Sequence, residues 1–364
     1  MSHSKLCLVG CQKKYPAFDS VSAIAKDVLG AQNVLEIRSR NPNIDVGFFK
    51  PVIYFFADIS ILLKIAKLHK TKKIQSLLIF QEYWPISSVG LRIMKIRSAI
   101  YVGGSSFEWS YMENRGLIGK LLAYSNLSIE RICHFSANMI ITLSPSMDKM
   151  LSADCVSKTF YALPRLDKSF MREFKMIKTY EERENIVGYV GGLSRRKGVQ
   201  NLLNAIPLVI SKKKCKFLIV GQGSMLKNVN TTVERLGIGH VVQVSGFIDY
   251  DSLCDCYNNM KVLAIPSYAE GIPSTIFEAM ACGTPVLSTS VGGIPDLIRD
   301  RETGFLLNSN DPTEIAAKII EVLENPSILT KIITSAYDKV KEKQLESSQS
   351  WRRILLYLNR NTPN

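Results

Sequence analysis

The chain has 364 residues, of which 46% are hydrophobic, and its 46 Lys and Arg against 32 Asp and Glu give a net charge of +14. This length suits two or three domains, and the composition excludes a disordered or fibrous chain. Lys50, Asp58 and Lys64 interrupt the most apolar stretch, so no membrane-spanning segment is expected. The first ten residues lack the long apolar core of a signal peptide, which predicts a cytoplasmic protein.

Short apolar runs rich in β-branched residues alternate with helical stretches, a pattern typical of parallel sheets in α/β proteins. The expected strands are residues 6–9, 34–37, 77–80, 99–102, 139–143, 186–190, 217–220, 241–244, 262–265 and 285–288. The chain ends in an expected helix over residues 326–360, with Trp351 and Leu355 at core-like spacing. We therefore expect two doubly wound domains, with these divisions: residues 1–165, a linker over 166–184, a second domain over 185–335, and a helical segment over 336–364 that packs back toward the first domain.

The positive charge is concentrated in the first domain, because residues 1–165 hold 21 Lys and Arg against 11 Asp and Glu, a net charge of +10. Such asymmetry indicates an anionic partner, which leaves nucleic acid, a membrane surface or a phosphorylated substrate open. Nucleic acid is disfavoured because there is no Cys/His finger, aromatic RNA-binding signature or long Arg-rich tract. The eight cysteines and four histidines are scattered, so we expect buried free thiols and no protein-held metal.

One basic stretch begins at Phe48 and ends at Lys73, where aromatic and aliphatic residues run into five lysines. A basic amphipathic segment of this kind can lie in the interface of an anionic membrane. The alternative is a strand and helix of an ordinary α/β domain with a solvated basic end. The sequence leaves both interpretations open.

The most informative segment is residues 267–296, which follows the expected strand 262–265. Glu270 falls in the loop, and Ser274 and Thr275 are expected N-caps of a helix that carries Glu278. Helix N-terminal amides stabilise anions such as a diphosphate. Glu278 could then reach hydroxyl groups of a ribose, and Glu270 those of a sugar beyond the phosphates. The alternative is that Glu270 is a solvated loop carboxylate and Glu278 only a helix-dipole partner.

A second segment, V-G-Y-V-G-G-L-S-R-R-K-G at residues 187–198, is a strand followed by a glycine turn and a basic cluster. Glycines let the backbone approach a ligand, and Lys197 together with Arg195 or Arg196 can bind phosphate oxygens. A plain surface turn with a charged helix start is the alternative. The Gly221 and Gly223 turn is no dinucleotide fingerprint, because Leu226 stands where the third glycine belongs.

The run E-G-I-P-S-T-I-F-E-A-M-A-C-G-T-P-V at 270–286 resembles the E-x7-E donor-site signature of retaining family 4 glycosyltransferases. Residues 187–198 are similar to the G-R-L-x-x-x-K-G segment of that family, with Gly192 where its Arg usually stands. Residues 245–248 resemble the turn on which the nucleotide base rests in that family. The resemblance implies a GT-B fold of two facing Rossmann-like domains with an interdomain cleft, the first on the acceptor side and the second binding the nucleotide sugar. The catalytic residues it implies are Glu270 and Lys197, and the implied donor-binding residues are Gly192, Arg196, Gly246, Phe247, Gly271, Ile272, Pro273, Ser274, Thr275, Ile276 and Glu278.

The implied function is retaining transfer of a sugar from a nucleotide sugar to a glycan, lipid-linked or small-molecule acceptor by a front-face mechanism. Neither a metal nor a cofactor is expected, and the location would be cytoplasmic or peripheral on the cytoplasmic face of a membrane. Gly103 stands where many members have a His, and the P-N-G-V-D segment is replaced by Pro164-Arg165-Leu166-Asp167. These departures keep two alternatives open: a sugar-nucleotide-binding subunit without catalysis, and a sugar-nucleotide epimerase of the same fold.

Overall fold

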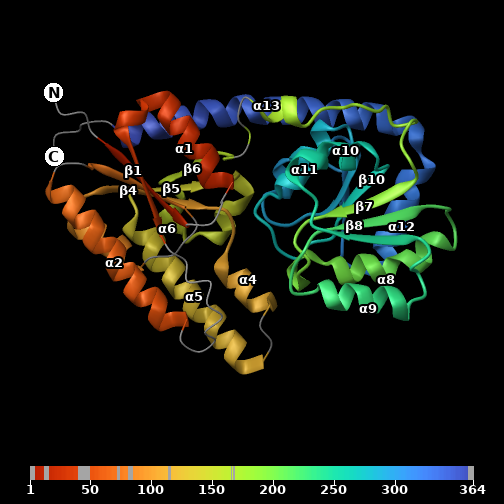
Figure 1. Cartoon of the computed structure of the whole chain (residues 1–364), viewed down its shortest axis with the longest axis horizontal. Coiled ribbons are helices and arrows are strands. Elements are labelled where there is room, and N and C mark those ends of the chain that lie inside the picture. The colour runs from red at the N-terminus through yellow and green to blue at the C-terminus, as the bar shows by residue number, and fades with distance from the viewer. Residues whose placement is uncertain are drawn as a thin grey trace. The chain divides into compact units, whose positions relative to one another are not determined.

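The computed structural model describes residues 5–11, 16–39, 50–71, 74–80, 85–113, 116–164, 166 and 169–359. The chain forms two compact α/β units (Figure 1). Unit 1 consists of Met1–Phe107, Leu117–Asp167 and Gln344–Asn364, and unit 2 of Glu108–Gly116 and Lys168–Lys343. The limits expected for the domains and the linker remain predictions.

Unit 1 is built on a six-stranded sheet in the order β2-β1-β3-β4-β5-β6, in which every pair is parallel. The strands are β1 (Leu6–Cys11), β2 (Val34–Ser39), β3 (Ser76–Phe80), β4 (Arg97–Val102), β5 (Met139–Thr142) and β6 (Thr159–Tyr161). All residues of β3 and β5 are buried. This is the continuous burial expected of parallel strands that are covered on both faces.

Helices cover both faces of this sheet. Their bounds are α1 (Pro16–Leu29), α2 (Lys50–Lys70), α3 (Pro85–Ile93), α5 (Gly116–Ser136) and the short α6 (Ala153–Val156). Helix α4 (Ser106–Glu113) begins in unit 1, and its residues from Glu108 onward belong to unit 2. On one face α2, α3 and α5 contribute Ile61, Leu91 and Cys133 to a single core with the strands. On the other face Phe18 of α1 packs edge-to-face on Phe80, with ring centroids 5.4 Å apart.

The last helix, α13 (Pro326–Leu358), contributes residues to both units. It is continuous at residues 335–336, where a new segment was expected to begin. Within unit 1, the indole Nε1 of Trp351 donates to the carbonyl oxygen of Leu163 at 3.0 Å, and Trp351 is fully buried. Leu355 is also fully buried, which confirms the core spacing predicted for this helix.

Unit 2 holds a second six-stranded parallel sheet, in the order β12-β11-β10-β7-β8-β9. The strands are β7 (Ile186–Val190), β8 (Lys216–Val220), β9 (Val242–Gly246), β10 (Val262–Ile265), β11 (Val286–Thr289) and β12 (Phe305–Leu307). The helices are α7 (Phe170–Glu173), α8 (Val199–Ile210), α9 (Leu226–Arg235), α10 (Leu253–Asn258), α11 (Ser274–Ala281) and α12 (Pro312–Glu324). Strands and helices alternate along the chain, as the sequence pattern predicts.

Much of the segment expected to be a linker is packed into unit 2. Arg183 is 4% exposed, and its guanidinium donates to the carbonyl oxygens of Tyr257 and Cys282 and to the hydroxyl of Thr284. A buried cation whose two terminal nitrogens are both paired holds this segment against α10 and the turn before β11. Charge density alone did not indicate this packing.

All ten expected strands are present within one or two residues of their limits, and β6 and β12 are two further short strands. The strand in the alternative for residues 48–73 is wrong, because Lys50–Lys70 form one helix, α2, while residues 48–49 and 72–73 lie outside the described residues. The helix with a solvated basic end is present, since Lys64, Lys67 and Lys70 are exposed. The cysteines whose surroundings the structure describes are free and buried, as expected. No described helix is long and apolar enough to cross a membrane.

Candidate active site

The strand order of unit 2 places its two sequence motifs side by side. β7 is the first strand of this sheet along the chain, and it lies between β10 and β8. The next strands, β8 and β9, extend the sheet on one side of β7, and β10 to β12 extend it on the other side. Ligands of open parallel sheets bind at such a switch point, beyond the carboxyl ends of the strands. The segment after β7 carries Arg196 and Lys197, and the segment after β10 carries Glu270.

A close backbone approach joins these two segments. Gly198 has φ of +70°, and a Cβ atom there would lie 1.8 Å from the carbonyl oxygen of Pro266. The amide of Tyr268 donates to the carbonyl oxygen of Arg196 at 2.8 Å. Only glycine fits both the left-handed conformation and this contact, so Gly198 fixes the basic turn Arg195–Lys197 against the loop after β10.

The carboxylate of Glu270 is the centre of the resulting cluster. Its Oε1 lies 2.5 Å from Nζ of Lys197 and accepts a hydrogen bond from the hydroxyl of Ser267 at 2.8 Å. Its Oε2 lies 3.3 Å from Nη1 of Arg196, which also donates to the carbonyl oxygen of Ala269 at 2.5 Å. The structure therefore brings together both predicted catalytic residues, and it places Arg196 beside them.

The two cations of this cluster are more accessible than the anion. The side chains of Lys197 and Arg196 are 20% and 21% exposed, whereas that of Glu270 is 5% exposed. Two positive groups around one carboxylate leave a net charge of +1 with the cations on the accessible side. Charge of this sign and placement suits an anionic ligand.

Helix α11 begins next to this cluster, although not at the residues expected. The N-cap is Pro273, with ψ of 129°, so Ser274 and Thr275 are the first helical residues and their expectation as N-caps is wrong. Pro273 has no side-chain acceptor for the first amides of the helix. The amide of Ile276 donates to the carbonyl oxygen of Pro273 at 3.1 Å, which engages one of the amides expected to face a diphosphate.

The loop after β11 packs against the backbone of the residues that precede α11. A Cβ atom on Gly292, which has φ of +59°, would lie 1.9 Å from the carbonyl oxygen of Glu270. The amide of Gly293 donates to the carbonyl oxygen of Gly271 at 2.7 Å. Gly292 and Gly293 thus fix the backbone of Glu270 and Gly271 just before α11.

Glu278 lies inside α11 and is 2% exposed. The hydroxyl of Tyr257, on α10, donates to its Oε2 at 2.8 Å, and Tyr257 is itself fully buried. Burial and the neighbouring carboxylate raise the pKa of Tyr257 well above its ordinary value, so the hydroxyl remains a donor. Sequence reasoning missed Tyr257, because nothing in the spacing of α10 relates it to the motif.

Gly192 leaves open space at the position where the resembling family has an Arg. The nearest atom to a Cβ there would be the carbonyl oxygen of Gln222, at 3.9 Å. The hydroxyl of the buried Tyr189 donates to the carbonyl oxygen of Gly192 at 2.8 Å and fixes the turn. The guanidinium that lies beside Glu270 belongs instead to Arg196.

Gly246 is the last residue of β9 rather than part of the following turn, which corrects the expected strand limit by two residues. Its carbonyl oxygen accepts from the amide of Gly221 at 2.7 Å, so the ends of β8 and β9 are joined there. Phe247 follows directly and is 67% exposed. The ring of Phe247 is therefore available to a ligand.

In unit 1, Gly103 lies in the bend after β4. The buried carboxylate of Glu130, on α5, accepts from the hydroxyl of Ser105 at 3.2 Å and from the amide of Phe107 at 3.2 Å. Glu130 thus fixes the segment between β4 and α4, a role that the sequence did not reveal. Among the described residues, no group of three or more His, Cys, Asp or Glu is placed to hold a metal ion.

Comparison with known proteins assigns the second unit. Residues 171–339 match the family model described as "Glycosyl transferases group 1". They form a group 1 glycosyltransferase domain. The domain includes the whole Glu270 cluster, α10 and α11.

Curated relatives of this domain are glycosyltransferases. An uncharacterised glycosyltransferase of Methanocaldococcus jannaschii is 32% identical over 163 residues, which is 45% of this chain and 42% of that protein. The capsular polysaccharide biosynthesis glycosyltransferase CapM of Staphylococcus aureus is 25% identical, over 59% of this chain and 60% of the relative. The chain thus spans about half the length of these relatives.

Similarity of structure extends over nearly the whole chain. Sucrose-phosphate synthase from Thermosynechococcus elongatus has a TM-score of 0.74 at 17% identity, covering 97% of this chain and all of that one. Anabaena HepE in complex with UDP-glucose also has a TM-score of 0.74, at 16% identity, covering 97% of this chain and 99% of HepE. These similarities confirm the GT-B fold predicted from the sequence.

Proposed function

We propose that the protein transfers a sugar from a nucleotide-sugar donor to an acceptor. The observation that carries the proposal is the cluster of Glu270, Lys197 and Arg196 at the switch point of a group 1 glycosyltransferase domain. A buried carboxylate can accept hydrogen bonds from sugar hydroxyls, and the two accessible cations suit the diphosphate. The complex of the similarly folded HepE with UDP-glucose supports a nucleotide sugar as the ligand class.

The reaction needs stabilisation of the negative charge that develops on the departing diphosphate. Lys197 and Arg196 supply positive charge at fixed positions, because Glu270 and the carbonyl oxygen of Ala269 hold them. Glu270 orients the donor sugar, and Glu278, held by Tyr257, binds the ribose. Phe247 lies under the nucleotide base. We assign donor contacts also to the backbone of Gly192, Gly246 and residues 271–276.

We further propose that transfer retains the anomeric configuration through a front-face mechanism, in which the acceptor hydroxyl attacks as the diphosphate leaves. The acceptor is a glycan, a lipid-linked sugar or a small molecule. No step of this proposal uses a metal ion or cofactor, so activity should survive a chelator. Complete loss of activity on chelation that added metal restores would contradict that part of the proposal.

The direct test of donor binding is a thermal-unfolding screen with nucleotide sugars. A ligand that binds only the folded protein raises Tm by mass action. At least one nucleotide sugar should raise Tm for the wild-type protein and raise it less for Lys197→Gln. No stabilisation by any sugar nucleotide, nucleoside diphosphate or nucleotide would contradict the proposal.

A sugar-nucleotide-binding subunit without catalysis is the second candidate, favoured by Gly103 and Gly192 at positions where the resembling family carries His and Arg. Slow hydrolysis of the stabilising donor without acceptor separates the two. An enzyme should release nucleoside diphosphate, and a binding subunit should not. Formation of an epimeric sugar nucleotide in the same assay would indicate the epimerase alternative.

A further inference from the structure

Three helices form one layer on unit 1. α2 and α3 pack together, and the guanidinium of Arg92 at the end of α3 donates to the carbonyl oxygen of Phe135 on α5 at 2.7 Å. The same guanidinium lies over the ring of Phe135, 4.6 Å from its centroid. Since all three helices contribute to one core with the sheet, their outward faces form a common surface, which we call the α2/α3/α5 surface.

A buried carboxylate fixes the orientation of α2 in this layer. Asp58 is 3% exposed and accepts from the amides of Ile86 and Ser87, at 2.8 and 2.9 Å, at the start of α3. Burial raises the pKa of Asp58, against the hydrogen bonds of Ser87 and Ile86 that lower it. The polar side of α2 is thus turned inward at this point, where it caps a neighbouring helix.

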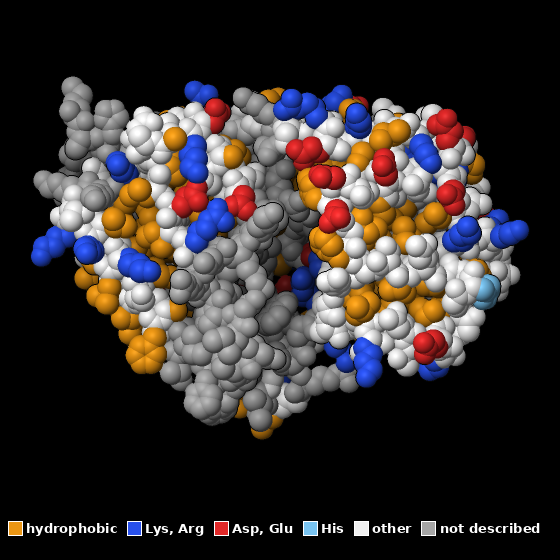
Figure 2. Space-filling view, viewed as in Figure 1, with side chains coloured by type: hydrophobic (Ala, Val, Ile, Leu, Met, Phe, Trp, Pro, Cys, Tyr) orange, Lys and Arg blue, Asp and Glu red, His pale blue; other side chains and the backbone are white. Residues whose placement is uncertain are grey.

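Large apolar side chains occupy the outward side instead. On α2, Phe56 and Leu63 are 64% and 65% exposed, and on α3 Ile93 is 75% exposed. α5 carries an exposed stripe at helical spacing, formed by Leu117, Leu121, Tyr124, Ile132 and Phe135. Figure 2 shows hydrophobic side chains in a row along the outer edge of α2.

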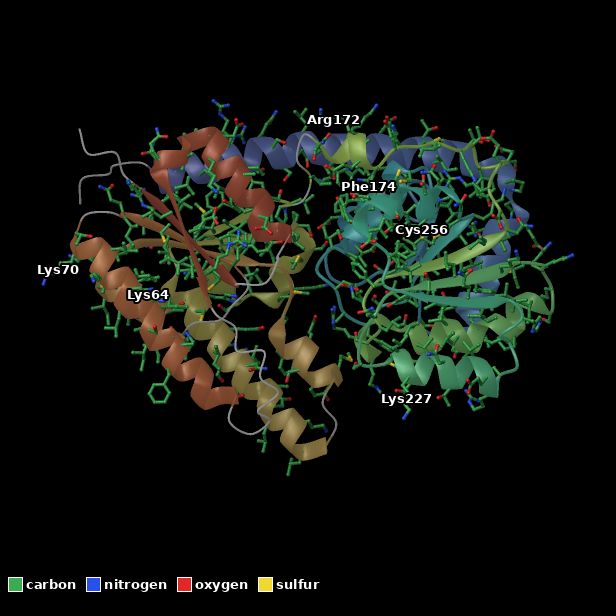
Figure 3. All side chains as sticks on the ribbon, in the orientation of Figure 1. Lys64, Lys70, Arg172, Phe174, Lys227 and Cys256 are labelled. Carbon is green, nitrogen blue, oxygen red and sulfur yellow. The ribbon has the colours of Figure 1, made fainter. Side chains whose placement is uncertain are left out.

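The exposed charges on the α2/α3/α5 surface all have one sign. Asp58 and Glu130 are the carboxylates in the sequences of the three helices, and both are 3% exposed. The exposed charged residues of the same helices are basic: Lys64, Lys67, Lys70, Arg92, Lys120 and Arg131. Figure 3 shows Lys64 and Lys70 on α2, with Lys70 near its end.

Apolar and basic groups also meet within a single hollow on α2, lined by Phe56, Ile59, Ser60, Leu63, Lys64 and Lys67. Lysine stems can lie along apolar surface while the ammonium groups stay with a polar phase. This arrangement matches the boundary between lipid acyl chains and anionic headgroups. In water alone, these apolar side chains would remain in contact with solvent, which is unfavourable.

We propose that the α2/α3/α5 surface docks unit 1 onto an anionic lipid bilayer. Phe56, Leu63 and the apolar stripe of α5 enter the interface, and the lysines of α2 remain at the headgroups. A second copy of this chain fits less well, because a symmetric contact would place the same basic side chains against one another. The surface extends beyond residues 48–73, since α3 and α5 also contribute exposed apolar side chains.

The test is co-sedimentation of the full-length protein with vesicles of phosphatidylcholine alone or mixed with phosphatidylglycerol. We expect binding to the mixed vesicles that weakens as salt shortens the Debye length from roughly 10 Å at 0.1 M toward 3 Å at 1 M. Replacing Lys64, Lys67 and Lys70 with Gln should weaken binding by roughly fivefold per lysine. Leu63→Ser with Leu121→Ser should also weaken it, at unchanged charge.

Matched controls distinguish binding through this surface from nonspecific binding of the protein to lipid. The charge control replaces the exposed Lys212, Lys214 and Lys227 of unit 2 with Gln, and the apolar control is Leu345→Ser, at 63% exposure on α13. Both controls should bind vesicles as the wild type does. Equal loss in the controls, or no binding to mixed vesicles at low salt, would overturn the proposal. So would salt-resistant self-association that Leu63→Ser with Leu121→Ser abolishes, because the surface would then join two copies. Donor binding by unit 2 is measured separately and is expected to be unchanged in every variant.

Discussion

Nζ of Lys197 lies 2.5 Å from Oε1 of Glu270, although the two residues belong to loops that follow different strands, β7 and β10. The ion pair holds the lysine in place before any ligand arrives. A carboxylate that is 5% exposed thereby positions a cation that is 20% exposed.

Lys197→Gln should weaken binding of nucleoside diphosphates by roughly tenfold to a hundredfold, as for loss of a charge-assisted contact. Binding of the corresponding nucleoside should change little, because the nucleoside lacks phosphates. Isothermal titration of both ligands measures the difference. Lys227→Gln, at an exposed site on α9 (Figure 3), is the matched control. Equal weakening of nucleoside and diphosphate would make Lys197 structural.

Tyr257→Phe should raise the KM for the donor by about tenfold while leaving kcat closer to the wild-type value. The reason is that Glu278 loses the hydroxyl donor at 2.8 Å that orients it, while the cluster around Glu270 is untouched. Steady-state kinetics with varied donor checks this. Tyr161→Phe removes a similar hydrogen bond, to Asp148 in unit 1, and should leave the KM unchanged. A loss confined to kcat would contradict a role in donor binding.

Gly198→Ala and Gly237→Ala form a matched pair, with φ of +70° and +64°. The alanine at 237 has open space, so it should cost only the left-handed conformation, about 1 kcal/mol of unfolding free energy. The alanine at 198 would meet the carbonyl oxygen of Pro266, so it should cost more and also weaken diphosphate binding. Denaturant unfolding and titration measure both effects. Similar behaviour of the two variants would show that the close approach is not needed.

The buried His134 should make the folded protein less stable at acid pH. Burial, with a smaller contribution from the Lys158 charge, lowers its pKa to about 4, while the unfolded chain has a pKa near the ordinary 6.5. The unfolded state therefore binds more protons between these values, so stability falls as pH decreases from 6.5 to 4, by up to about 3 kcal/mol. Denaturant unfolding across this range measures the slope. His134→Leu should flatten it, and an unchanged slope would assign the acid sensitivity to other groups.

Much of the structure of unit 2 was predictable from sequence, because the sequence patterns that indicate it are local. Strand limits follow from short apolar runs, and the spacing of Glu270 and Glu278 follows from one turn and one helix. The orientation of Arg196 was not predictable, since it depends on the contact of Gly198 with Pro266, 68 residues further along the chain. Tyr257 was missed for a similar reason, because a hydrogen bond between two helices, α10 and α11, leaves no periodic pattern in the sequence.

The helix α2 shows where composition misleads. Its aromatic and β-branched residues suggest a strand, yet they form one helix whose buried side is fixed by Asp58 binding the first amides of α3. A polar residue inside and phenylalanine outside reverses the usual rule of burial. Such a reversal is decided by tertiary contacts, and the sequence indicated only that the segment was apolar and basic.

The central claim is that Glu270 orients a donor sugar for transfer, and release of nucleoside diphosphate from the stabilising nucleotide sugar tests it most directly. The assay compares the wild type with Glu270→Gln and with Glu302→Gln, whose side chain is 66% exposed on the same unit. Glu270→Gln should lose activity by a hundredfold or more, roughly the effect of removing one preorganised group, while keeping the fold by circular dichroism. Glu302→Gln should match the wild type. Release by Glu270→Gln within a few-fold of wild type would contradict the account.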